Sequence, residues 1–270
     1  MMWRITTMML LAAWSVLARA ETLRVSDLDV SKVQVLGSIE VEISQGDQNL
    51  LLVRADPELL SMRPFYAQGD TLVLGASREH PAEDFSSVKY KLTLVELADL
   101  RLSGSGDVFV RPFQVRDFRV TVEGSGDVKI FSLVADTARL NVAGSGDIQL
   151  AELTADAVGA MVSGSGDIDI GDITTEDVKA TISGSGDVAV KRSHRPVKTA
   201  ELNVVGNGEI DFAAMAIAAA EINIIGSGDA RVGDVEQLQA NIIGSGDTYY
   251  AGDPQVDSFV LGSGDLNRQR

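Results

Sequence analysis

The tetrapeptide Gly-Ser-Gly-Asp recurs nine times along this chain and constrains its fold more than any other feature. One copy departs from it, as Gly206-Asn207-Gly208-Glu209. A fixed period near 20 residues, with one such unit per repeat, is typical of a solenoid. The copies are separated by 20, 20, 20, 20, 22, 20, 18 and 18 residues and begin at Gly104, Gly124, Gly144, Gly164, Gly184, Gly206, Gly226, Gly244 and Gly262.

The residues between the tetrapeptides alternate between apolar and polar side chains. In one repeat Val178, Ala180 and Ile182 are apolar, and Val188 and Val190 resume the apolar row after the turn. A period of two predicts half-buried strands. We therefore interpret each repeat as strand, sharp turn, strand, with a looser second corner such as residues 171–175. Helices are disfavoured, because a glycine pair every 20 residues would interrupt each of them.

The chain is predicted to be all-β, a single-stranded parallel β-helix of about nine coils of 18–22 residues with a strand-rich N-terminal part. A repeat this short cannot close a core alone, but stacked coils bury their aliphatic rows against one another. A meander of hairpins folded into a sandwich is the alternative, because Gly-Ser-Gly between strands also suits a hairpin. The constant period favours the solenoid, since stacked coils require equivalent positions to stay equivalent.

Three segments are expected: a signal peptide at 1–20, a strand-rich part at 21–100 continuous with the solenoid, and the repeats at 101–270. In the second segment, residues 32–35 and 38–43 alternate as strands do. Pro57 after Asp56 predicts a short helical turn with Asp56 as its cap. Residues 77–87 are polar, carry Pro81 and are expected to form a loop.

The first twenty residues resemble a secretory signal peptide. Arg4 supplies a positive start, an apolar run follows, and Ala18-Arg19-Ala20 fits a cleavage site. The chain has no cysteine, so neither a lipoprotein anchor nor a disulfide framework is expected. No later apolar run reaches about 18 residues, and no transmembrane segment is expected. We predict an exported chain in the periplasm, on the outer surface or secreted.

The chain is acidic, with a formal net charge of −16. Without Arg4 and Arg19 the balance is 21 basic against 39 acidic residues, or −18. Such a field repels nucleic acid and anionic lipid and favours solubility and cation binding. No nucleic-acid partner is expected.

The tetrapeptide glycines are interpreted as structural turn residues, because glycine adopts backbone angles that are unfavourable for residues with a Cβ. In the stack the carboxylates form a column that includes Asp127, Asp147, Asp167 and Asp187. They are expected to accept hydrogen bonds from turn N–H groups. The alternative places calcium between them, since hard oxygen ligands suit it. The turn glycines are Gly104, Gly106, Gly124, Gly126, Gly144, Gly146, Gly164, Gly166, Gly184, Gly186, Gly226, Gly228, Gly244 and Gly246.

No catalytic residues are assigned. The only histidines, His80 and His194, are far apart in loop-like stretches, and a cysteine nucleophile is absent. A polysaccharide lyase or glycosidase is the enzymatic alternative, since β-helices often carry such sites. Aromatic residues are only 5%, however, and the acids are regularly spaced rather than clustered. Residues 191–198 form a basic segment in the single 22-residue repeat, which is interpreted as a solvated loop or as a contact for an anionic partner.

Several segments carry a resemblance to a known family. They are residues 32–47, the stretch 55–60, and the approach to the first tetrapeptide at 97–107. With the repeats they resemble the head GIN-domain family, exported bacterial proteins described as heads of autotransporter adhesins. The resemblance spans about 30 to 265 and implies a β-helix with glycine-serine-glycine turns, no assigned catalytic residues and a role in adhesion.

We therefore predict a non-enzymatic exported scaffold or binding module, involved in adhesion or envelope surface contact. Its partner would be a protein or glycan of the cell envelope, self-association is an open possibility, and no cofactor other than calcium is considered. A purely structural periplasmic protein is the other non-enzymatic alternative.

Overall fold

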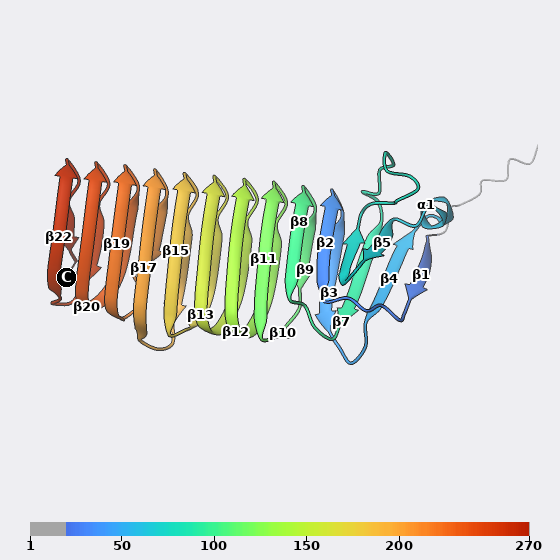
Figure 1. The fold of residues 1–270 in the computed structure, drawn as a ribbon, viewed down its shortest axis with the longest axis horizontal. Coiled ribbons are helices and arrows are strands. Elements are labelled where there is room, and N and C mark those ends of the chain that lie inside the picture. Colours follow the sequence, from blue (N-terminus) through green and yellow to red (C-terminus); the bar gives the residue numbers. More distant parts are fainter. Residues whose placement is uncertain (1–19, 270) are drawn as a thin grey trace, which may run out of the picture.

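The computed structural model describes residues 20–269, which form one long stack of β-coils (Figure 1). The predicted signal peptide, apart from Ala20, lies outside the described residues. From residue 99 to 268 the coils follow one another in chain order and pair in parallel, so the predicted β-solenoid is confirmed. The alternative of hairpins in a sandwich is wrong, because equivalent strands of successive repeats run in the same direction.

The repeat region consists of sixteen strands. They are β8 (Asp99–Gly104), β9 (Asp107–Val110), β10 (Phe113–Gln114), β11 (Asp117–Gly124), β12 (Val128–Gly144), β13 (Ile148–Gly164), β14 (Ile168–Thr174), β15 (Asp177–Gly184), β16 (Val188–Ser193), β17 (Val197–Gly206), β18 (Glu209–Phe212), β19 (Ile217–Gly226), β20 (Asp229–Gly244), β21 (Thr248–Ala251), β22 (Gln255–Gly262) and β23 (Leu266–Arg268).

The register follows the tetrapeptide. Gly144 pairs with Gly164, which in turn pairs with Gly184. The extra two residues of the 22-residue repeat fall before β17, so Gly184 still pairs with Gly206. The looser second corner predicted at 171–175 is only partly found, because β14 continues to Thr174 and β12 and β13 pass the same corner without a break. The chain bends there while its ladder hydrogen bonds continue.

The core is a column of aliphatic side chains inside the stack. Val178, Ala180, Ile182, Val188 and Val190 are all buried, as the alternation predicted. Each stacks on equivalent residues in the neighbouring coils, for example Ile182 between Val162 and Val204. Burial of such a side chain contributes about 1.5–3 kcal/mol, and the row repeats in every coil.

The N-terminal part adds seven strands and a helical turn to the stack. They are β1 (Glu21–Val25), β2 (Lys32–Gly37), β3 (Glu40–Gln45), β4 (Leu50–Ala55), α1 (Pro57–Ser61), β5 (Phe65–Gln68), β6 (Thr71–Leu74) and β7 (Lys89–Leu94). The helical turn begins at Pro57 as predicted, but Asp56 makes no side-chain capping hydrogen bond. Residues 75–88 contain no strand, so the loop predicted at 77–87 is confirmed.

The first coils do not stack in chain order. Strand β2 pairs in parallel with β8 and also with β6, and β3 pairs with both β9 and β7. The coil of β2 and β3 therefore lies between the coil of β6 and β7 and the first coil with a full tetrapeptide. The remaining N-terminal strands pair antiparallel: β4 pairs with β7, β1 pairs with β4, and β5 pairs with β6. These antiparallel strands close the N-terminal end of the stack (Figure 1).

Within the part of the chain that the structure describes, no helix is long and apolar enough to cross a membrane.

Candidate functional site

The first glycine of each tetrapeptide has a positive φ, between +126° and +153°. L-residues rarely adopt this backbone conformation. A Cβ at these positions would also lie 1.9–2.4 Å from the carbonyl oxygen of the equivalent glycine in the preceding coil. That carbonyl is occupied: Gly124 O, for example, accepts the N–H groups of Ser145 and Gly146 at 2.8 and 3.1 Å. Conformation and close packing both require glycine here.

The second glycine is required by packing alone. None of these glycines has a positive φ. A Cβ on any of them would lie 2.0–2.3 Å from a backbone carbonyl oxygen of the preceding coil. For Gly106 that oxygen belongs to Ile39, which occupies the place of the second glycine in its own coil. Ile39 fits because the coil before it has the open loop at 75–88 in place of a tight turn.

The carboxylates that follow the second glycine form hydrogen bonds from coil to coil. Oδ1 of Asp127, Asp147, Asp167 and Asp187 accepts the backbone N–H of the residue at the same position in the next coil, at 3.1, 2.9, 2.8 and 2.8 Å. The series is interrupted at Glu209, where Asp229 N–H bonds to Gly208 O instead, and resumes at Asp229. Among the residues 20–269, no group of three or more acidic, histidine or cysteine side chains is placed to hold a metal ion.

Burial raises the pKa of the Asp167 carboxyl above its ordinary value. The hydrogen bond from the Asp187 N–H lowers this pKa, and the negative charges of Asp187 and Asp147 raise it further. Burial likewise raises the pKa of Asp187. An acid with a raised folded-state pKa loses its proton first in the unfolded chain. The contribution of these carboxyls to stability is therefore greatest below their unfolded pKa of about 3.9 and falls as the pH rises through the folded value.

We expect Asp167→Asn to be at least as stable as the native chain at pH 7, because the amide oxygen still accepts the Asp187 N–H and the charge is gone. Any gain in the free energy of unfolding should disappear near pH 3.5, where the Asp167 carboxyl of the native chain is itself largely protonated. Asp167→Ala removes the acceptor and should cost about 1 kcal/mol. Chemical unfolding at both pH values measures these differences.

Calcium provides the control for the carboxylate column. If the carboxylates serve only as hydrogen-bond acceptors, the melting midpoint at pH 7 should be the same with calcium and with chelator in all three chains. A midpoint that rises with calcium in the native chain but not in Asp167→Asn would contradict this interpretation.

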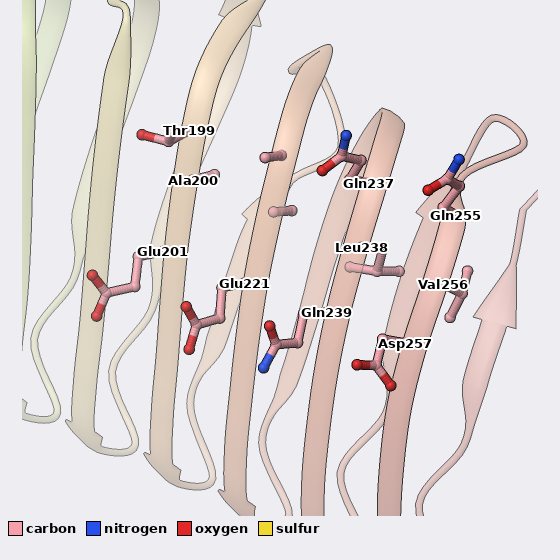
Figure 2. A pocket seen from close by; sticks show the side chains of 12 residues that line it. Thr199, Ala200, Glu201, Glu221, Gln237, Leu238, Gln239, Gln255, Val256 and Asp257 are labelled. Atoms are coloured by element: carbon pink, nitrogen blue, oxygen red, sulfur yellow. The ribbon is translucent and has the colours of Figure 1, made fainter.

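A shallow groove of about 640 Å³ lies on the outer face of the last four coils. Figure 2 shows a row of polar side chains along it, one from each of β17, β19, β20 and β22: Glu201, Glu221, Gln239 and Asp257. These four are in-register neighbours. Lys179 bonds to Glu201 Oε1 at 2.6 Å, and this bond and one from Asn203 lower the pKa of the Glu201 carboxyl. An ionised Glu201 suits hydrogen bonding to a polar ligand and does not suit the general acid of a glycosidase, whose pKa is raised.

A row of asparagines runs beside the groove. Asn223 Nδ2 donates to Asn203 Oδ1 at 3.0 Å, and Asn241 Nδ2 donates to Asn223 Oδ1 at 2.9 Å. In β22 the equivalent residue is Phe259. The hydrogen bonds hold the amides in a fixed row, so the surface is flat and repeats at the spacing of the coils.

Four exposed aliphatic side chains form a further row on the same face, which we call the apolar stripe: Val205, Ile225, Ile243 and Leu261. They are 47%, 51%, 43% and 60% exposed. The alternation of apolar and polar residues does not predict this row. Its signal is the pair of adjacent apolar residues before the glycine, such as Ile224-Ile225, which breaks the alternation seen in earlier repeats. Exposed apolar patches of this kind mark interaction sites.

Several cations of the basic segment at 191–198 pair with acids of the same chain. Arg192 makes a bidentate pair with Asp172 at 2.7 Å, and His194 lies 2.8 Å from the same carboxylate. The hydrogen bond from Arg192 holds the pKa of the Asp172 carboxyl well below its usual range. Arg195 and Lys198 pair with Glu176. Since these cations face acids of the preceding coil, the segment joins two coils. A contact of this segment with an anionic partner stays a prediction.

The comparisons with known proteins agree with this architecture. The profile of the family described as "Putative auto-transporter adhesin, head GIN domain" matches residues 29–195 and 196–254. No curated protein matches the chain. Among solved structures, a "putative adhesin" from Parabacteroides merdae is similar, with a TM-score of 0.72 and 19% identity over 93% of this chain and 97% of that one. A "putative lipid binding protein" from Parabacteroides distasonis has a TM-score of 0.68 and 25% identity over the same shares. Neither name specifies an enzymatic activity.

Proposed function

The chain belongs to the family described as "Putative auto-transporter adhesin, head GIN domain", and from this premise we propose that it is a non-enzymatic binding module of the cell envelope. The proposed contact surface is the outer face of β17, β19, β20 and β22. The observation that carries the proposal is the alignment there of three parallel rows: the polar row of the groove, the asparagines and the apolar stripe.

The chemistry of these rows suits a ligand that is extended along the stack. Carboxylate and amide groups present hydrogen-bond acceptors and donors at a constant spacing, and the aliphatic row provides adjacent apolar contact. A glycan of the envelope, or an extended segment of an envelope protein, offers the matching repeat of polar groups beside apolar faces. Export by the signal peptide, to the periplasm, the outer surface or the medium, is part of the same proposal.

Substitution within the apolar stripe tests the proposal. We expect Ile225→Lys combined with Ile243→Lys to reduce retention of the purified chain on envelope fractions about tenfold or more, because two exposed apolar side chains that the ligand would cover are replaced by charges. Pull-down of the labelled chain with isolated envelopes measures this. The matched control is Val134→Lys, which adds a charge at a position that is 41% exposed on another part of the stack, in β12.

Equal retention of the stripe variant and the native chain would overturn the proposed surface. Release of sugar products from envelope polysaccharides would instead support the enzymatic alternative. Fractionation of cells separates adhesion from a purely structural role: the mature chain on the outer surface supports adhesion, and strict retention in the periplasm opposes it.

A lipid is the second candidate ligand, favoured by the apolar stripe and by the name of one similar structure. The acidic chain would repel an anionic bilayer, so the lipid would be a single molecule whose acyl chain lies along Val205, Ile225 and Ile243. Binding of a fluorescent fatty acid to the native chain, together with loss of that binding in the chain with Ile225→Lys and Ile243→Lys, would support a lipid over a glycan.

A further inference from the structure

The two ends of the stack differ. The N-terminal end is closed by antiparallel strands of the same chain. At the other end, β22 pairs on one side with β20 and β23 with β21, and within residues 20–269 neither has a strand on its outer side (Figure 1). Every residue of β22 is exposed. A strand edge of this kind presents a row of backbone N–H and C=O groups that another strand can pair.

Strand β22 itself carries few of the features that usually prevent pairing. Native edges are protected by charged side chains, proline or bulges, yet β22 has one charged residue, Asp257, and no proline. Its interior positions are Val256, Ser258 and Val260. Val256 and Val260 are 42% and 40% exposed, whereas the equivalent Leu238 and Ile242 of the coil before are 2% and 0% exposed. Within residues 20–269, the aliphatic column of the solenoid is therefore exposed to solvent at this end.

We propose that a second copy of this chain covers the open end, with the two β22 strands antiparallel about a two-fold axis. The β22 edges of two copies match each other, because a two-fold contact brings the apolar column of one copy against the apolar column of the other. The outer strand at the opposite end, β1, is shorter and carries Glu21 and Arg24, so it offers no comparable apolar row for head-to-tail stacking.

The period of the strand fixes the register. A pair of antiparallel strands continues both faces only when interior residues oppose interior residues. With the axis at Ser258, Val256 lies opposite Val260 of the partner subunit, so the interior column continues. On the outer face Asp257 then lies opposite Phe259 of the partner subunit, and no like charges are directly opposed.

The dimer would also extend the surface described above. Gln255, Val256 and Asp257 belong to β22 and line the end of the groove. In the dimer the grooves of the two copies meet at the axis, and the two apolar stripes lie on one continuous face. This extension of the binding surface rests on the proposed function, but the dimer itself does not.

Sedimentation of the native chain tests the dimer. We expect a species of twice the chain mass at micromolar concentrations. Its share should increase between 50 and 500 mM salt, because each copy carries a formal charge of −16 and salt screens the repulsion between copies. Val260→Lys should weaken the dimer about tenfold or more. Ile225→Lys, a change at a more exposed position of a strand in mid-stack, should leave the dimer intact.

A single cysteine tests the register. The chain has none of its own, and the Cα atoms of residues at the centre of an antiparallel pair are about 4.5–5.5 Å apart, which suits a disulfide. Ser258→Cys should form a reducible dimer on mild oxidation, whereas Ser183→Cys, exposed in mid-stack, should not. A native chain that is monomeric at all salt concentrations, or equal cross-linking of both variants, would overturn the proposal. A native chain that forms the dimer but is not retained on envelope fractions would count against the proposed function only.

Discussion

Gly164→Ala should destabilise the protein by about 3 kcal/mol or more. The new Cβ would lie 2.2 Å from the carbonyl oxygen of Gly144, and the residue would keep a φ of +139°. That oxygen accepts hydrogen bonds from Ser165 and Gly166 at 2.9 and 3.2 Å, so it cannot move away without losing them. Because the same turn is stacked on both sides, the displacement would pass to the neighbouring coils. Denaturant unfolding measures the loss.

Gly159→Ala is the matched control in the same strand, β13. A Cβ at this position meets nothing within 4 Å, and the backbone has no positive φ. Replacement of a strand glycine by alanine lowers the entropy of the unfolded chain, so the expected change is a slight stabilisation of a few tenths of a kcal/mol to about 1 kcal/mol. Equal effects at 159 and 164 would show that glycine at the turn is not required by its geometry.

Ile182→Ala should cost about 2–5 kcal/mol, the second large effect. Ile182 is fully buried between Val162 and Val204 of the adjacent coils, and one of its methyl groups also approaches Gly208. The cavity cannot close easily, because the strands on either side are held in register by the turns. Hydrogen exchange should show that the loss of amide protection is concentrated in the coil of Ile182 and its neighbours, since each coil of a solenoid contacts only its neighbours.

Val205→Ala is the control for the interior column. The side chain lies one coil away and is 47% exposed, so the expected change is within about 0.5 kcal/mol. Similar losses at 182 and 205 would contradict the assignment of interior and exterior rows.

The repeat region could be predicted from the sequence because its constraints are local and identical in each coil. The glycines set the turn, the alternation sets the buried face, and equal spacing sets the register. The second corner was harder to predict: a stretch such as Gly171-Asp172 suggests a loop, yet β14 passes through it with its ladder intact.

The arrangement of the first coils could not be predicted. Strand β2 is separated from β8 in the sequence by β3 to β7 but lies beside it in the stack, and no local pattern encodes such a long-range pairing. In the coil of β2 and β3, residues 37–40 occupy the position of the tetrapeptide, and Gly37 is in register with Gly104. The similarity to the tetrapeptide is hard to recognise because Ile39 stands where the second glycine would be. The preceding coil in the stack, that of β6 and β7, has an open loop in place of a tight turn, so position 39 does not require glycine.

The candidate site was predicted only in part. The carboxylate column follows from the period alone, and its members do lie in successive coils. The apolar stripe was missed because each member looks like one more aliphatic residue in an aliphatic chain. Only the three-dimensional structure shows that Ile224 is buried and Ile225 is exposed.

In the solenoid, equivalent positions of successive coils lie directly above one another, and a pair of introduced cysteines tests this stacking most directly. Ser163 and Ser183 are in-register neighbours on the exposed face of β13 and β15, and parallel strands lie about 4.8 Å apart, within the reach of a disulfide. Ser163→Cys with Ser183→Cys should form an intramolecular disulfide and raise the melting temperature. Ser163→Cys with Val205→Cys, two coils apart, should remain reduced. Closure of the second pair but not of the first would contradict the stacking.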